Sequence, residues 1–178
     1  MTRHTGITMA PLLHVLENLR PADQEEMDAI HGEGWAVPVI ADIVFRLATK
    51  NCGWLFWHEG EPVAAIGAYA MTPTCAGCWA FGTPRWSKVV LGVTRHVRRT
   101  MIPLLLRVGF HRAECRALFK RSDTKRWLTS LGWEPEAVLS EFGARREDFL
   151  LFAWCAHEQT HHPPGPERRS PLSLRNGG

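Results

Sequence analysis

Residues 62–83 read PVAAIGAYAMTPTCAGCWAFGT, and this stretch decides the fold class. Its first half, Pro62 to Met71, is dense in valine, alanine, isoleucine and tyrosine, as is typical of a β-strand. Its end, Cys78 to Thr83, has the composition of a second strand. Just upstream, Gly53 to Trp57 is a short aromatic-rich strand, and His58-Glu59-Gly60-Glu61 is a turn that joins it to Pro62 as a hairpin. We therefore predict three consecutive strands at the centre of the chain.

Elements of both kinds surround these strands. Apolar residues at helical spacing and capping residues predict the helices, and short apolar runs predict the strands. The expected elements, in order, are a strand at Leu12–Asn18, helices at Asp23–Ile30 and Val39–Thr49, the three central strands, a helix at Ser87–Val108 with a kink or break at Pro103, a strand at Arg116–Phe119, a helix at Thr124–Leu131, and strands at Ala137–Phe142 and Asp148–Cys155. The order β-α-α-β-β-β-α-β-α-β-β predicts an α/β fold with one mixed sheet.

Composition predicts one globular domain. The chain has 178 residues, 45% hydrophobic and 22% charged, which suffices for a substantial core. We expect a flexible N-terminus at residues 1–11, the domain at 12–156, and a disordered basic tail at 157–178, which has almost no bulky apolar residues. No apolar run approaches the roughly 18–20 residues of a membrane span, and no secretory signal is apparent. We expect no membrane segment and no secretion.

Five cysteines, an odd number, favour free thiols over a disulfide framework. Cys75 and Cys78 have zinc-like spacing, and Cys52 and His58 lie near enough in sequence to complete a site. A structural zinc site needs four ligands, however. Small residues in a turn are the alternative interpretation, and we predict no metal site.

Basic residues concentrate in one part of the chain. They are Arg95, Arg98, Arg99, Arg107, His111, Arg112, Arg116, Lys120, Arg121, Lys125 and Arg126. Such a strip either contacts phosphate, as in DNA, or is the solvated face of helices. Of the eight tryptophans, Trp57 and Trp86 fall near predicted strand ends, and tryptophan is enriched at interface hot spots. Trp57, Trp86, Arg95, Arg98 and Arg99 are therefore the candidate interaction residues.

Two segments carry a family resemblance. Leu19-Arg20-Pro21-Ala22-Asp23 resembles the first strand-to-helix passage of the GNAT (Gcn5-related N-acetyltransferase) fold, and Trp127-Leu128-Thr129-Ser130-Leu131-Gly132-Trp133 resembles its helix-to-strand segment. The order of elements agrees. The resemblance implies a mixed sheet with the cofactor held where two central strands splay. Within that group, the chain looks like the GNAT-like internal virion proteins of short-tailed phages. The segments that carry this narrower resemblance are Cys78–Thr83, Trp86, the arginine-rich helix, Ser122–Gly132 and Phe149–Phe152.

The resemblance also implies a loop for coenzyme A. In the family, a loop Arg/Gln-x-x-Gly-x-Gly/Ala offers backbone N–H groups to the cofactor pyrophosphate at a helix N-terminus. The corresponding residues 83–92, TPRWSKVVLG, contain one glycine, a proline and the bulky Trp86. This loop is degenerate, and only side chains remain to touch phosphate. The candidate cofactor-binding residues are Thr83, Arg85, Ser87 and Lys88.

Catalytic residues are not apparent in the sequence. Many family members use a tyrosine on the helix before the Leu-Gly-Phe turn as an acid, and Leu128 occupies that place here. The only tyrosine is Tyr69, on a predicted strand. No base or nucleophile has an evident partner, so we name no catalytic residue.

Three hypotheses follow. The first is a non-catalytic GNAT-like phage virion or assembly protein, without cofactor, whose partners are other phage proteins in the host cytoplasm or the virion. The second is an active N-acetyltransferase that uses acetyl-CoA with an atypical loop. The third is a DNA-binding module on the same fold, with contacts through the basic helices.

Overall fold

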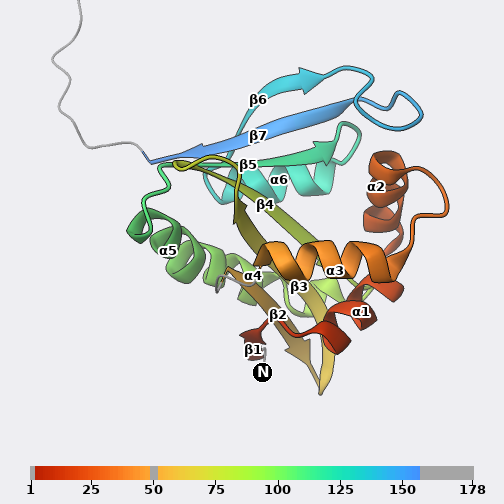
Figure 1. Ribbon diagram of the computed structural model, residues 1–178. Helices are drawn as coiled ribbons and strands as arrows, with labels where there is room; N and C mark the ends of the chain where they lie inside the picture. Colours follow the sequence, from red (N-terminus) through yellow and green to blue (C-terminus); the bar gives the residue numbers. More distant parts are fainter. Residues whose placement is uncertain (1–2, 49–51, 157–178) are drawn as a thin grey trace, which may run out of the picture.

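A computed structural model describes residues 3–48 and 52–156 (Figure 1). Within them one seven-stranded sheet has the order β1-β2-β3-β4-β5-β7-β6. All neighbouring strands pair antiparallel except β4 and β5, which are parallel. The strands are β1 (Arg3–Gly6), β2 (Gly53–His58), β3 (Glu61–Ala70), β4 (Cys75–Gly82), β5 (Arg112–Leu118), β6 (Glu134–Leu139) and β7 (Phe149–Cys155). The predicted mixed α/β sheet is confirmed.

The helices occupy three stretches of the chain. They are α1 (Met9–Glu17), α2 (Pro21–His31) and α3 (Val37–Ala48) before the hairpin, a 3-10 turn η1 (Trp86–Lys88), α4 (Val90–His96), the π-helical segment η2 (Val97–Met101) and α5 (Ile102–Arg107) after β4, and α6 (Ser122–Ser130) after β5. The predicted break at Pro103 appears as η2 and the new start of α5. Proline removes a backbone donor, so the preceding turn changes its hydrogen-bond pattern.

The N-terminal predictions need correction. Residues expected to be flexible form β1, which pairs with β2, and the beginning of α1. The strand predicted at Leu12–Asn18 is wrong, because these residues belong to α1. Leu12, Val15 and Leu16 are buried at helical spacing, so the period of 3.6 outweighs their apolar composition. The predicted tail at 157–178 lies outside the described residues.

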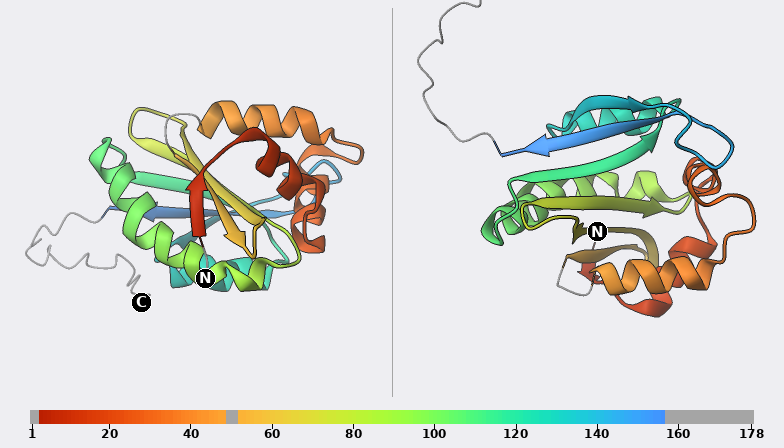
Figure 2. Two further views of the ribbon diagram at one scale, coloured as in Figure 1. Left: turned by 90° about the horizontal axis from the view of Figure 1, so that it is seen from below. Right: turned by 45° about the horizontal axis from the view of Figure 1, so that its top comes forward.

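Helices cover both faces of the sheet (Figure 2). On one face α1 and α3 pack on Leu55 and Ala65. On the other face α4, η2, α5 and α6 pack on the alternate residues Phe56, Ala64 and Ile66. Because successive side chains of a strand point to opposite faces, the apolar hairpin β2–β3 supplies both cores.

The centre of the sheet is split. The parallel strands β4 and β5 pair only where Cys75, Ala76 and Gly77 lie opposite Arg112, Ala113 and Glu114. Beyond these residues the two strands diverge, while each keeps its outer antiparallel neighbour. The backbone groups that face the gap must therefore find partners outside the sheet.

Candidate active site

The end of β4 is held by the start of α2. Asp23 Oδ2 accepts the Gly82 N–H at 2.8 Å, and the Arg20 N–H donates to the Gly82 carbonyl at 2.8 Å. Asp23 lies in the first turn of α2, and the N-cap of this helix is Arg20. The side chain of Asp23 thus replaces the partner that β5 does not provide.

The end of β5 is held by the same helix. Glu26 Oε2 accepts the Leu118 N–H at 3.2 Å. Arg121 Nη1 donates to Asp23 Oδ1 at 2.8 Å and to Glu26 Oε2 at 3.1 Å, so one guanidinium joins the two carboxylates. With side-chain exposures of 6% for Arg121 and 5% for Asp23, this pair is buried. The acids of α2 therefore hold the two diverging strand ends.

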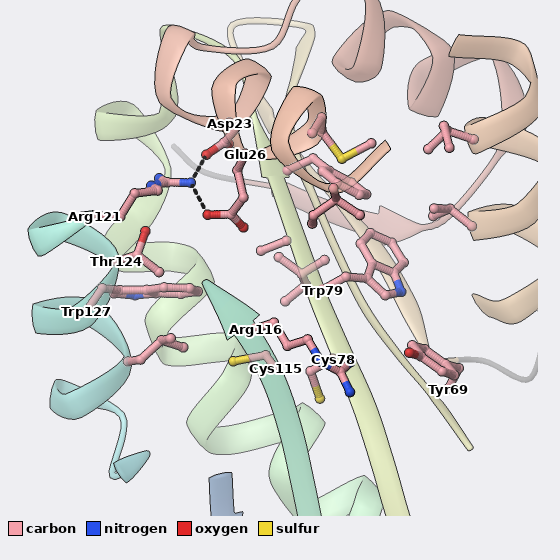
Figure 3. A pocket seen from close by; sticks show the side chains of 18 of the residues that line it. Asp23, Glu26, Tyr69, Cys78, Trp79, Cys115, Arg116, Arg121, Thr124 and Trp127 are labelled. Atoms are coloured by element: carbon pink, nitrogen blue, oxygen red, sulfur yellow. Dashed lines mark hydrogen bonds and ion pairs between the residues drawn. The ribbon is translucent and has the colours of Figure 1, made fainter. Parts of the chain in front are cut away.

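Glu26 differs from Asp23 in its surroundings. Its side chain is 19% exposed and borders a cavity. One carboxylate oxygen is bonded to Arg121, and the other points away from it (Figure 3). Burial raises the pKa of the Glu26 carboxyl above its usual value, and the charge of Arg121 offsets this only in part. A partly desolvated carboxylate with a free oxygen is suited to accept a proton.

This central cavity has a volume of about 350 Å³ and occupies the gap between β4 and β5. On one side it is bordered by α2 and α3, and on the other by η2 and α6 (Figure 3). Because α3 and α6 pack on opposite faces, the cavity reaches both faces of the sheet.

Aromatic side chains form the wall on the α3 side. An added Cβ at Gly77 would lie 2.4 Å from Tyr69 Cζ, and one at Gly67 would lie 2.3 Å from Trp79 Cζ2. The rings of Tyr69 and Trp79 therefore lie directly on the backbone of neighbouring strands. Phe81 stacks on Trp79 with ring centroids 5.3 Å apart. The absence of a side chain at Gly67 and Gly77 therefore allows the two rings to lie against the sheet.

We predict that Gly67→Ala lowers the free energy of unfolding by about 2 kcal/mol, as overpacking does. The added methyl would also lie 2.8 Å from the carbonyl oxygen of Cys52, which cannot move as a side chain does. Urea unfolding measures the effect. Gly6→Ala is the control, since no atom of the described residues lies within 4 Å of its Cβ position. Equal stability of the two variants would contradict this description of the wall.

Several backbone N–H groups of the loop after β4 are hydrogen-bonded within the protein. The Thr83 N–H donates to Val63, the Trp86 N–H to Thr83, the Lys88 N–H to Arg85 and the Val89 N–H to Trp86. The first of these bonds ties the loop to β3, and the other three form the turn around η1. The N–H groups of Trp86, Lys88 and Val89 are therefore already bonded inside the loop, while the degenerate character of the loop toward pyrophosphate stays a prediction.

Trp86 closes one side of the cavity. An added Cβ at Gly82 would lie 2.6 Å from its ring. The ring of Trp127 meets it edge-on at 5.5 Å, and the Arg20 guanidinium lies 4.7 Å from its centroid. The indole N–H of Trp127 donates to Thr94 Oγ1 at 2.9 Å, which ties α6 to α4. Trp86 is thus half-buried between the ring of Trp127 and the guanidinium of Arg20.

The four predicted cofactor residues lie on one loop but point to different partners. Thr83 is buried, and its Oγ1 accepts the Arg85 N–H at 3.3 Å. The Arg85 guanidinium donates to Glu59 and Glu61 in the β2–β3 turn. Ser87 and Lys88 are exposed in η1. A role of these residues in cofactor binding stays a prediction, best suited to Ser87 and Lys88.

On α6, Leu128 is buried at the place where the family tyrosine is expected. Thr124 precedes it by one turn and borders the same cavity (Figure 3). Glu26, Thr124, Arg116 and Arg121 were not predicted as site residues. The only signal for them in the sequence was the acidic first turn of a helix after Arg20-Pro21. No local pattern could show how these residues meet, because the contacts that bring them together join residues more than 90 positions apart.

The predicted interaction residues do not form one surface. Trp57 is half-buried and donates to Thr5 Oγ1 at 3.0 Å. Arg95, Arg98 and Arg99 are exposed on α4 and η2, and Arg98 donates to the Ser130 carbonyl of α6. Contact with DNA through these arginines stays a prediction.

Two other kinds of site can be considered for residues 3–48 and 52–156. There, no three or more His, Cys, Asp or Glu side chains gather as metal ligands would. No helix in the same residues is long and apolar enough to cross a membrane.

Known structures with this fold can now be compared. A phosphinothricin acetyltransferase of Sinorhizobium meliloti, in complex with acetyl-CoA, is 11% identical with a TM-score of 0.66, over 93% of this chain and 94% of that chain. A ribosomal-protein-alanine N-acetyltransferase of Brucella melitensis is 14% identical with a TM-score of 0.67, over 86% and 99%. An N-acetyltransferase of Staphylococcus aureus is 9% identical with a TM-score of 0.66, over 88% and 99%. The chain has the GNAT fold. No protein-family model and no curated protein sequence matches it.

The comparison corrects the leading functional hypothesis. The chain was expected to be a non-catalytic phage virion or assembly protein, yet the three structures named above are all acetyltransferases, and one of them holds acetyl-CoA. Nothing connects the chain to phage particles. The implied GNAT fold was right, whereas the narrower resemblance to phage proteins has no support.

Proposed function

We propose that this protein is an N-acetyltransferase that uses acetyl-CoA. The observation that carries the proposal is the central cavity, which passes through the gap between β4 and β5 and is bordered by the free oxygen of Glu26. A cavity that reaches both faces of a sheet lets two substrates approach a common point from opposite sides. The acetyltransferases of the same fold support this reading.

The residues present fit the acyl end of acetyl-CoA better than they fit its pyrophosphate. The acyl end fits the gap between the strands, where Cys78, Ala80, Thr124 and Trp127 border the cavity. The pyrophosphate would be held by the exposed side chains of Ser87 and Lys88, because the N–H groups of Trp86, Lys88 and Val89 already donate within the loop. Bound acetyl-CoA would supply the acetyl group as a thioester open to attack by an amine.

Glu26 would act as the general base. An amine is an ammonium ion at neutral pH and must lose a proton before it attacks. The carboxylate of Glu26 accepts that proton, and its raised pKa brings it closer to neutral pH. Arg121 and the Leu118 N–H hold the carboxylate in place through its other oxygen.

The leaving group would meet no tyrosine on α6. Leu128 holds that place, and Thr124, one turn earlier, brings a hydroxyl to the cavity wall. Cys115 also borders the cavity, but burial raises its pKa to about 12, so its thiol neither ionises nor competes as a nucleophile near neutral pH.

The test is acetyl transfer itself. The purified chain is incubated with acetyl-CoA and a mixture of small primary amines, and free coenzyme A thiol and acetylated amine are measured together. We expect both products in equal amounts. Thiol release without acetylated amine would be hydrolysis, and with no thiol release above the protein-free rate the proposal fails.

A further inference from the structure

The α3 side of the central cavity combines one cation with an apolar wall. Arg116 extends from β5 into the gap beside Cys78 (Figure 3). It is exposed and forms no ion pair within the described residues, its contact being the Phe142 ring at 5.5 Å. Arg20, Arg112 and Arg121 each pair with a carboxylate. Arg116 therefore has its guanidinium available to an anion from outside.

Arg116 and Glu26 border the same cavity, Arg116 from β5 and Glu26 from α2. A ligand in the gap thus meets an anion from α2 and a cation from β5. A guanidinium pairs well with a carboxylate, because it donates two parallel hydrogen bonds.

The rest of this side is apolar. Tyr69 and Trp79 cover the sheet, and the aliphatic side chains of Ile30, Ile43 and Leu47 border the opening although each is partly exposed, at 38%, 47% and 42%. Exposed aliphatic residues around a cavity are unusual unless a ligand covers them. Among the described residues, Asp23 and Glu26 are the acids that border the cavity.

We propose that the acceptor is a free α-amino acid with an aliphatic or aromatic side chain. Its ammonium group faces Glu26, its carboxylate pairs with Arg116, and its side chain lies against Tyr69, Trp79 and Leu47. The inference rests on the proposed function. In the transfer, Glu26 takes one proton from the ammonium group, and the amine nitrogen then bonds to the acetyl carbon. The bond from that carbon to sulfur breaks, and a second proton from the nitrogen passes to the departing thiolate, so that coenzyme A leaves as the thiol.

Binding to the free protein tests this acceptor without acetyl-CoA. L-phenylalanine and L-phenylalaninamide, which lacks the carboxylate, are titrated calorimetrically into the full chain. We expect the acid to bind about ten- to a hundredfold more tightly than the amide, as for a hydrogen bond to a charged group. In Arg116→Met this preference disappears. In Arg107→Met, the exposed control on α5, it is retained.

Equal binding of the acid and the amide by the unaltered protein would overturn the inference, as would an unchanged preference in Arg116→Met. Tighter binding of lysine or glutamate than of phenylalanine would also overturn it. If other amines are acetylated while phenylalanine neither binds nor reacts, the acceptor is wrong and the proposed function stands. If phenylalanine binds through Arg116 and no amine is acetylated, the proposed function is wrong and the site only binds amino acids.

Discussion

Asp23→Asn is expected to lower the free energy of unfolding by about 3 kcal/mol, because removing one partner of a buried ion pair leaves the other charge uncompensated. Asp23 accepts the Gly82 N–H, pairs with Arg121 and lies 2.9 Å from Arg20 Nε. Arg121 keeps Glu26 and Asp123 as partners, which limits the loss. For a chain of this size the melting temperature should fall by roughly 6 to 12 °C, measured by circular dichroism.

Asp42→Asn is the matched control for Asp23→Asn. It breaks an ion pair with Arg46 on α3 whose side chains are 49% and 77% exposed, and exposed pairs contribute about 0–1 kcal/mol. A melting temperature of Asp23→Asn within 1–2 °C of this control, about the effect of an exposed pair, would show that α2 does not hold the end of β4.

Glu26→Gln is expected to lower kcat about a hundredfold or more, the usual contribution of a positioned general base. Glutamine keeps the shape of the side chain and an oxygen for the Leu118 N–H, but it cannot accept a proton. Steady-state kinetics of acetyl transfer measure the loss. Glu25→Gln is the control, since Glu25 precedes it on α2 and pairs with Lys120 at the surface; it should retain full activity.

The pH profile separates a base from a structural role. The base acts only when ionised, so the activity should fall as the pH drops through the pKa of Glu26. Because that pKa is raised, the fall should begin above the usual range of a glutamate, near 4.3. In Glu26→Gln this acidic limb should vanish. An unchanged limb in the variant would assign it to another group.

Six of the seven strands in the described residues, all but β1, and most helices followed from local sequence. The hairpin turn at Glu59-Gly60 has positive φ at both residues, as two-residue hairpins require, and the apolar runs on either side are unambiguous. Leu12–Asn18 misled because a short apolar run of this kind is compatible with a strand or a helix. Burial of Leu12, Val15 and Leu16 against α3 and β3 decides for the helix.

The site was harder to predict, because its residues meet only through the fold. Arg121 contacts Asp23 across 98 positions and Glu26 across 95, and no local pattern in the sequence predicts that meeting. The sequence did show the altered loop and the missing tyrosine at Leu128. It could not show that carboxylates of α2 bond the strand ends on both sides of the gap between β4 and β5, because these contacts form only in the fold.

Calorimetric titration of the full chain with acetyl-CoA tests most directly whether the chain binds this cofactor. We expect a single site with a dissociation constant in the micromolar range, and we expect weaker binding when Ser87 and Lys88 are both replaced by alanine. The replacement of Arg107 by methionine, on α5, should leave it unchanged. No heat and no thermal stabilisation at millimolar acetyl-CoA would mean that the cavity between β4 and β5 does not receive the cofactor, and the acetyltransferase function would be excluded.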